Sequence, residues 1–138
     1  TEAPPEMQER WEKAREGSRA AFAAMRPGVL GWDVDRAQRE LLEVNGSIPI
    51  IWSTGHPVGY WAHDLGPRLG GSAGGAPASG DAARLLRAGQ TFAFDGFFGW
   101  RRDDGTTKTI SVEEMVVITD DGAEWLIPPQ EDLVLIGS

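Results

Sequence analysis

Cysteine is absent from this chain of 138 residues, so it can form no disulfide, bind no metal through a thiolate and use no cysteine nucleophile. Long apolar runs are also lacking, because the longest aliphatic stretch, residues 115–118, is far shorter than the ~20 residues that span a bilayer. The formal net charge is −8, whereas a nucleic-acid-binding protein normally carries a basic patch. The first residues contain no apolar signal-peptide core. We therefore expect a cytoplasmic protein that binds neither nucleic acid nor membrane.

The first third of the sequence has the periodicity of two amphipathic helices. Apolar or small residues recur at steps of three and four from Met7 to Met25, which predicts a helix over about residues 4–26. A second stripe predicts a helix over residues 34–44, with Asp33 as its N-cap and a stop at Asn45 and Gly46.

The composition and pattern of the remaining sequence are typical of β-structure. Residues 47–53 are apolar and β-branched, which favours a strand. Residues 66–80 are rich in glycine, alanine, serine and proline, which predicts a mobile surface loop. Residues 91–136 contain two long strand patterns and two Asp-Gly turns, so we expect this region to be rich in β-structure. Helices followed by antiparallel strands indicate an α+β fold.

The turn between the two long strands predicts which acidic residues face each other. With a three-residue loop at 103–105, Asp95 lies opposite Glu113; with a two-residue turn, Asp95 would lie opposite Glu114. Opposed acids are unfavourable unless they share a proton or bind a cation. The alternative is a solvated pair of surface charges.

Histidine is scarce too, and both copies, His56 and His63, occur in one stretch of eleven residues, TGHPVGYWAHD. Gly55, Pro57 and Gly59 argue against a helix here, so we expect an irregular segment. Imidazole together with carboxylates is a plausible ligand set for Mn, Co, Fe or Zn. The alternative is a structural role for both histidines.

The order of four phrases resembles one known family. The phrases are RPGVLGWDVD, TGHPVGYWAHDLGP, RAGQTFAFDGFF and ISVEEMVVITDDGAEWL. Their order is similar to that in the pita-bread metallopeptidases, which include Xaa-Pro aminopeptidase, prolidase, methionine aminopeptidase and the non-metal relative creatinase. The Xaa-Pro aminopeptidase and prolidase branch is the most similar. The resemblance implies an α+β pita-bread fold, in which a curved antiparallel sheet carries outer helices, and it makes residues 1–138 the C-terminal part of the catalytic domain.

The resemblance also implies roles for individual residues. His56, Asp95 and Glu113 match positions that ligate metal, and this selects Glu113 over Glu114. His63 matches a histidine that contacts the substrate, Asp95 is a candidate for proton transfer, and we also expect Trp52 to contact the substrate. The implied enzyme uses two divalent metal ions (Mn, Co, Fe or Zn) to hydrolyse the bond before a proline at the second position of a peptide. We expect it to be a homo-oligomer.

The sequence departs from the family pattern in ways that leave an alternative open. The family has two metal-binding aspartates upstream of the first helix, so we expect a preceding segment or a partner chain to supply them, and this chain alone to be inactive. Asp95 stands where the family has glutamate, and Ser111 where the branch often has arginine. The alternative is an inactive or metal-free relative, either a peptide-binding module or a creatinase-like hydrolase.

Overall fold

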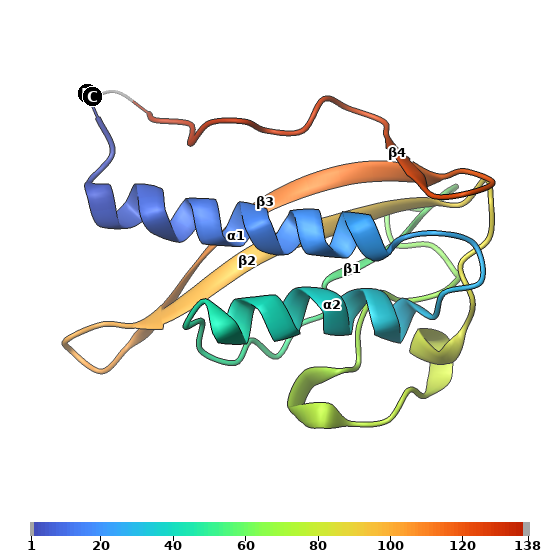
Figure 1. Cartoon of the computed structure of the whole chain (residues 1–138), viewed down its shortest axis with the longest axis horizontal. Coiled ribbons are helices and arrows are strands. Elements are labelled where there is room, and N and C mark those ends of the chain that lie inside the picture. The colour runs from blue at the N-terminus through green and yellow to red at the C-terminus, as the bar shows by residue number, and fades with distance from the viewer. Residues whose placement is uncertain (1, 137–138) are drawn as a thin grey trace.

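The computed structural model describes residues 2–136 as two helices packed on one face of an antiparallel sheet (Figure 1). The helices are α1 (Pro5–Ala24) and α2 (Gly31–Val44). The strands pair in the order β1-β2-β3-β4, with bounds β1 (Gly55–Val58), β2 (Thr91–Arg101), β3 (Thr107–Ile118) and β4 (Ala123–Trp125). Two short 3-10 helices, η1 (Ala73–Gly75) and η2 (Gly80–Ala83), lie between β1 and β2. The expected α+β class is confirmed.

Helix α1 is close to its predicted bounds and buries the predicted face. It begins at Pro5, where the missing N–H costs nothing in the first turn, and it ends two residues before 26. The side chains of Trp11, Ala14, Ser18 and Ala21 are buried at steps of three and four. This stripe packs against β2 and β3.

Helix α2 begins three residues earlier than predicted, and Asp33 is not its N-cap. Leu30 occupies the N-cap position without a side-chain hydrogen bond, and Asp33 lies in the first turn, 3.0 Å from the Arg36 guanidinium. The reason is a close approach from elsewhere in the chain. A Cβ on Gly31 would lie 2.1 Å from the carbonyl oxygen of Arg68, so the glycine lets residue 68 pack against the helix start.

The two faces of the sheet have different characters. Successive side chains of a strand point to opposite faces. Phe92 and Phe94 of β2 belong to the buried core with Ala21, Met25 and other apolar residues. Asp95 directly follows Phe94 in β2, so its side chain points to the opposite face of the sheet.

Two other segments differ from their predictions. Residues 47–53 form no strand, because the backbone carbonyls of Ile50 and Trp52 accept hydrogen bonds from the Arg39 side chain instead of from a neighbouring strand. Within the glycine-rich stretch 66–80, Leu69 is fully buried and its backbone pairs with Gly55. The first part of that stretch is therefore packed into the molecule rather than lying over its surface.

The C-terminal stretch is less rich in strands than predicted. The last strand ends at Trp125, and residues 126–136 run back beside α1 without forming another strand (Figure 1). Arg15 and Arg19 of α1 hold this stretch through Glu131, at 2.7 and 3.3 Å. Of the helices within residues 2–136, none is long and apolar enough to cross a membrane.

The packing of α1 on β2 generates a stability prediction. A Cβ on Gly96 would lie 2.1 Å from the carbonyl oxygen of Ala14, a backbone atom that cannot move aside cheaply. Gly96→Ala should therefore lower the free energy of unfolding by about 2–3 kcal/mol, as measured by urea denaturation. Gly122→Ala is the matched control, since its nearest neighbour lies 3.9 Å away. Equal stability of the two variants would contradict this packing.

Candidate active site

The β2–β3 hairpin brings Asp95 and Glu113 together. Asp95 is the direct cross-strand partner of Glu113, and the backbone N–H of Arg102 donates to Thr106 at 2.7 Å. Gly105 closes the loop with a φ of +81°, the left-handed conformation that a three-residue loop with a bulge requires. The predicted register is confirmed. Glu114 instead pairs with Phe94 and is buried on the opposite face.

Strand β1 places His56 on the same face as the two acids. His56 pairs with Ala93, two residues before Asp95, and residues two apart in a strand share a face. Asp95 is half-buried, whereas Glu113 is exposed. An open pocket of about 390 Å³ gathers all the residues predicted to form the site, and its lining is Trp52, Ser53, Gly55, His56, His63, Arg68, Asp95 and Glu113.

A tight loop brings the imidazole ring of His63 against that of His56. The two imidazole rings are stacked, with 3.6 Å between their centroids and 16° between their planes. The Asp64 carboxylate closes the loop by accepting hydrogen bonds from the N–H groups of Trp61 and Leu65. The expectation of an irregular segment is therefore half right, because His56 lies in β1 and only His63 lies in the loop.

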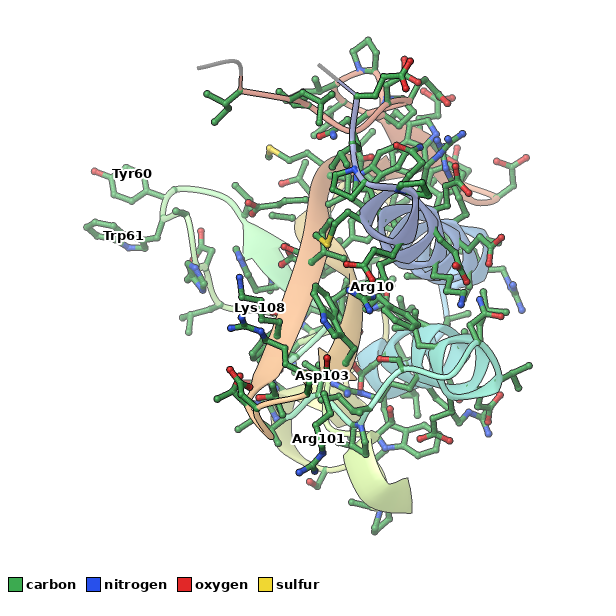
Figure 2. All side chains as sticks on the ribbon, turned by 90° about the vertical axis from the view of Figure 1, so that its left-hand side faces the viewer. Arg10, Tyr60, Trp61, Arg101, Asp103 and Lys108 are labelled. Atoms are coloured by element: carbon green, nitrogen blue, oxygen red, sulfur yellow. The ribbon has the colours of Figure 1, made fainter. Side chains whose placement is uncertain are left out.

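The tip of this loop carries two exposed aromatic residues. Tyr60 and Trp61 project from the side of the sheet opposite the helices (Figure 2), and their exposed fractions are 89% and 66%. They are absent from the pocket lining, which identifies Trp52 as the aromatic wall of the site.

The electrostatics of the pocket favour a bound proton or cation at Asp95. Burial and the nearby Glu113 carboxylate together raise the pKa of Asp95 to about 6, although His56 lowers it. The Nδ1 atom of His56 lies 3.1 Å from the carbonyl oxygen of Pro57. Because a carbonyl only accepts, this Nδ1 carries the hydrogen, and the Nε2 lone pair is left available to a metal.

The pocket contains side chains of the types that bind divalent metals, but these side chains do not already form a metal-sized cluster. One imidazole and two carboxylates are the donors that such ions take, and all three line one pocket. Within residues 2–136, however, no three His, Asp or Glu side chains already form a cluster that could hold a metal.

Sequence reasoning missed two contributions to the site. Arg68 lines the pocket from the glycine-rich stretch, for which the composition predicts only a surface loop. Asp35, fully buried in α2, binds the backbone next to the pocket through Thr54. The phrase GWDVD contains Asp35, but no local pattern reveals that its side chain is buried.

A second open pocket lies at the other end of the molecule. It has a volume of about 460 Å³ and lies between the start of α1 and the β2–β3 hairpin, where Figure 2 labels Arg10, Arg101, Asp103 and Lys108. Arg10 there lies over the Trp100 ring at 4.3 Å. The lining contains no histidine, so the imidazole–carboxylate chemistry is confined to the first pocket.

Comparison with known proteins identifies the family. The sequence matches the model of metallopeptidase family M24 over residues 1–120. The chain belongs to metallopeptidase family M24. The pita-bread fold implied by the resemblance is thereby confirmed. No curated protein matches the sequence.

Several solved structures share the fold of this M24 chain. Dipeptidase PepE from Mycobacterium ulcerans is 26% identical with a TM-score of 0.76, over 96% of this chain and 32% of that one. X-Pro aminopeptidase from Thermotoga maritima is 22% identical with a TM-score of 0.77, over 98% of this chain and 34% of that one. Methionine aminopeptidase from Rickettsia prowazekii is 18% identical with a TM-score of 0.67, over 90% of this chain and 53% of that one. The M24 chain thus spans about a third of the first two structures.

The Asp95–Glu113 pair generates a prediction for the metal-free protein. The Asp95 carboxyl should titrate with a midpoint of about 6 in a ¹³C NMR experiment. Glu113→Gln should lower that midpoint, because it removes one of the two causes that raise the pKa. Glu114→Gln is the control and should leave the midpoint unchanged, since Glu114 lies on the other face. A midpoint near 4 in the unaltered protein would contradict the geometry.

The same shift predicts how stability depends on pH. Folded Asp95 has a pKa of about 6, above the ~3.9 of an unfolded aspartate, so the folded state binds the proton more tightly between these values. The contribution of Asp95 to folding is therefore full below about pH 4 and lost as the pH rises through 6. Asp95→Asn should remove this loss from the free energy of unfolding measured by urea denaturation across that range. If the free energy of unfolding of Asp95→Asn showed the same pH dependence as that of the unaltered protein, this role of Asp95 would be refuted.

Proposed function

We propose that this chain forms part of the active site of a metal-dependent peptidase of the Xaa-Pro aminopeptidase or prolidase type. The observation that carries the proposal is the convergence of His56, Asp95 and Glu113 on one pocket, in a chain of family M24. The proposed substrate is a peptide with proline at its second position. Several solved structures of this fold are prolidases or X-Pro aminopeptidases by name, which supports this branch.

In this proposal, His56, Asp95 and Glu113 would hold a divalent metal, the histidine through its Nε2 atom and the two acids through their carboxylate oxygens. The complete enzyme contains two such ions, drawn from Mn, Co, Fe or Zn. When bound, divalent ions lower the pKa of water and polarise the scissile carbonyl group. The remaining ligands, two aspartates among them, come from a part of the protein outside residues 1–138 or from a partner chain.

The other pocket residues position the substrate. A ring nitrogen of His63 donates a hydrogen bond to the oxygen of the scissile carbonyl, where negative charge develops in the transition state. Its stack on His56 orients the ring. Trp52, half-exposed at 48%, provides a flat apolar wall against which a substrate side chain packs. A carboxylate oxygen of Asp95 takes a proton from the attacking water and delivers it to the leaving amine.

A second function is favoured by the incomplete ligand set. Among the described residues no three-ligand cluster exists, and Asp95 is one methylene shorter than glutamate. A relative that binds peptides without cleaving them, or a metal-free hydrolase in which His63 transfers protons, fits these two observations. Binding of a proline-containing peptide that a chelator leaves unchanged would favour this function over the first.

The division of roles between the two histidines generates a prediction. In the complete protein, His56→Ala should abolish cleavage of a peptide with proline at its second position and remove about one equivalent of bound Mn²⁺. His63→Ala should also reduce kcat strongly, on the order of 10²–10³-fold, but retain its metal. Metal content by mass spectrometry and steady-state kinetics separate the two variants. Survival of activity in His56→Ala would refute the assignment of His56, and loss of metal in His63→Ala would refute that of His63.

The incomplete ligand set generates a further prediction. Residues 1–138 alone should bind Mn²⁺ at least about tenfold more weakly than the complete protein, because ligands are missing. Isothermal titration calorimetry of both proteins measures the difference, with Glu113→Gln of the complete protein as a reference for the loss of one ligand. Equal affinity of the short chain and the complete protein would contradict the proposal of ligands outside this chain.

A further inference from the structure

We infer that Asp35 and Arg39 of α2 are positioning residues for the pocket that contains His56 and Asp95. They act through the backbone of residues 50–54 and through the buried side chain of Thr54. The inference rests on the proposed function, because it concerns how the same pocket is held in shape.

The Asp35 carboxylate joins three segments of the chain. Asp35 is fully buried. Its Oδ1 atom accepts hydrogen bonds from Thr54, from the backbone N–H at 3.2 Å and from the hydroxyl at 2.6 Å. Its Oδ2 atom accepts two from Ser72, from the N–H at 2.9 Å and from the hydroxyl at 2.6 Å. The Arg39 Nε–H also donates to Oδ2, at 2.9 Å. Both carboxylate oxygens are thus occupied by the protein itself.

Arg39 extends this network along the wall of the pocket. Its side chain is almost fully buried and lies next to Asp35, one helical turn away. Its two terminal nitrogens donate to the carbonyl oxygens of Ile50 and Trp52. The guanidinium therefore braces the irregular segment that carries Trp52 into the pocket.

Thr54 connects this hydrogen-bond network to the backbone of Asp95. The carbonyl oxygen of Thr54 accepts a hydrogen bond from the backbone N–H of Asp95 at 2.8 Å. Gln38, one turn from Asp35 on α2, donates to the Thr54 hydroxyl at 3.0 Å and to the Asp95 carbonyl oxygen at 2.9 Å. The backbone of Asp95 is thus fixed at both its N–H and its carbonyl group, and His56 follows Thr54 by two residues.

The opposite wall of the pocket depends on the same carboxylate. Gly55 and Leu69 exchange two backbone hydrogen bonds, at 2.9 and 3.0 Å, which places Arg68 at the pocket. Ser72, three residues beyond Leu69, is anchored on Asp35. One buried anion therefore sets the distance between the segment before His56 and the segment that contains Arg68.

Stability alone is a poor explanation for this arrangement. A buried ion pair contributes little net stability, because apolar side chains of similar volume are often as stabilising. Burial alone would raise the pKa of Asp35, but hydrogen bonds from Arg39, Ser72 and Thr54 hold it below its usual range. A charged acceptor is therefore present at neutral pH, and it directs donors that a neutral amide could not direct in the same way, because an amide has only one acceptor oxygen.

The test compares Asp35→Asn with Asp33→Asn in the complete protein. Asp33 lies on the same helix and also pairs with an arginine, but at the surface. Titration of the apoprotein with Co²⁺, followed by the visible absorption of the bound ion, measures affinity and coordination geometry. We expect Asp35→Asn to weaken Co²⁺ binding on the order of 10–100-fold and to alter the absorption band, and Asp33→Asn to do neither. Equal binding by the two variants would overturn the inference.

Two further comparisons separate positioning from loss of fold. Val34→Ala truncates a buried apolar neighbour on the same helix and serves as the stability-matched variant in thermal unfolding. If it weakens Co²⁺ binding as much as Asp35→Asn does, the role of Asp35 is merely structural. If Asp35→Asn does not fold, Thr54→Val, which keeps the shape but removes the hydroxyl, takes its place. The expected loss of Co²⁺ affinity in Thr54→Val should be restored in Thr54→Ser, and absence of rescue overturns the inference.

These readouts also distinguish the two proposals. An unaltered protein that neither binds Co²⁺ nor cleaves a peptide with proline at its second position refutes the proposed function and the inference together. An unaltered protein that does both, with an Asp35→Asn variant indistinguishable from it, refutes the positioning role alone.

Discussion

The buried carboxylate of Asp35 is the constraint on which the shape of the pocket depends. An ionised aspartate with no exposed surface has lost its hydration, and only dense hydrogen bonding makes that state tolerable. Here the compensation comes from Thr54, Ser72 and Arg39, which belong to three different parts of the chain. Because each donor must reach the same two oxygen atoms, the relative positions of those segments are narrowly defined.

The two faces of the sheet have different roles. One face packs against the helices, and the other presents the side chains of the candidate active site. On the helix side, Gly96 permits the backbone of α1 to approach β2, and Phe92 and Phe94 of β2 pack in the core with residues of α1. On the other side, the same strand presents Asp95 opposite Glu113 and next to His56. A cation would offset the unfavourable proximity of the two carboxylates, which is the physical basis for the proposed metal site.

Parts of this arrangement could be predicted from sequence because they depend on local rules. The Asp-Gly loop determines the hairpin register, and the register places Asp95 opposite Glu113. The apolar stripe of α1 likewise predicts which face of the helix is buried. The choice of Glu113 over Glu114 required the family resemblance as well, because two turn lengths were compatible with the sequence.

Other parts depend on contacts between distant residues and left no local signal. The start of α2 is decided by the approach of Arg68 to Gly31, so the expected Asp33 cap was wrong. Residues 47–53 form no strand although their composition favours one, and Arg39 binds the carbonyl groups of Ile50 and Trp52 there. The glycine-rich stretch contributes Leu69 to the core and Ser72 to the Asp35 network, which its low-complexity composition conceals.

The central claim is that His56, Asp95 and Glu113 bind the same metal centre. A crystal of the complete protein grown with Mn²⁺ and measured at a wavelength where manganese scatters anomalously tests it most directly. The account predicts an anomalous peak in contact with the Nε2 atom of His56 and with carboxylate oxygens of Asp95 and Glu113. Manganese bound elsewhere, with these three side chains free of metal, would contradict it.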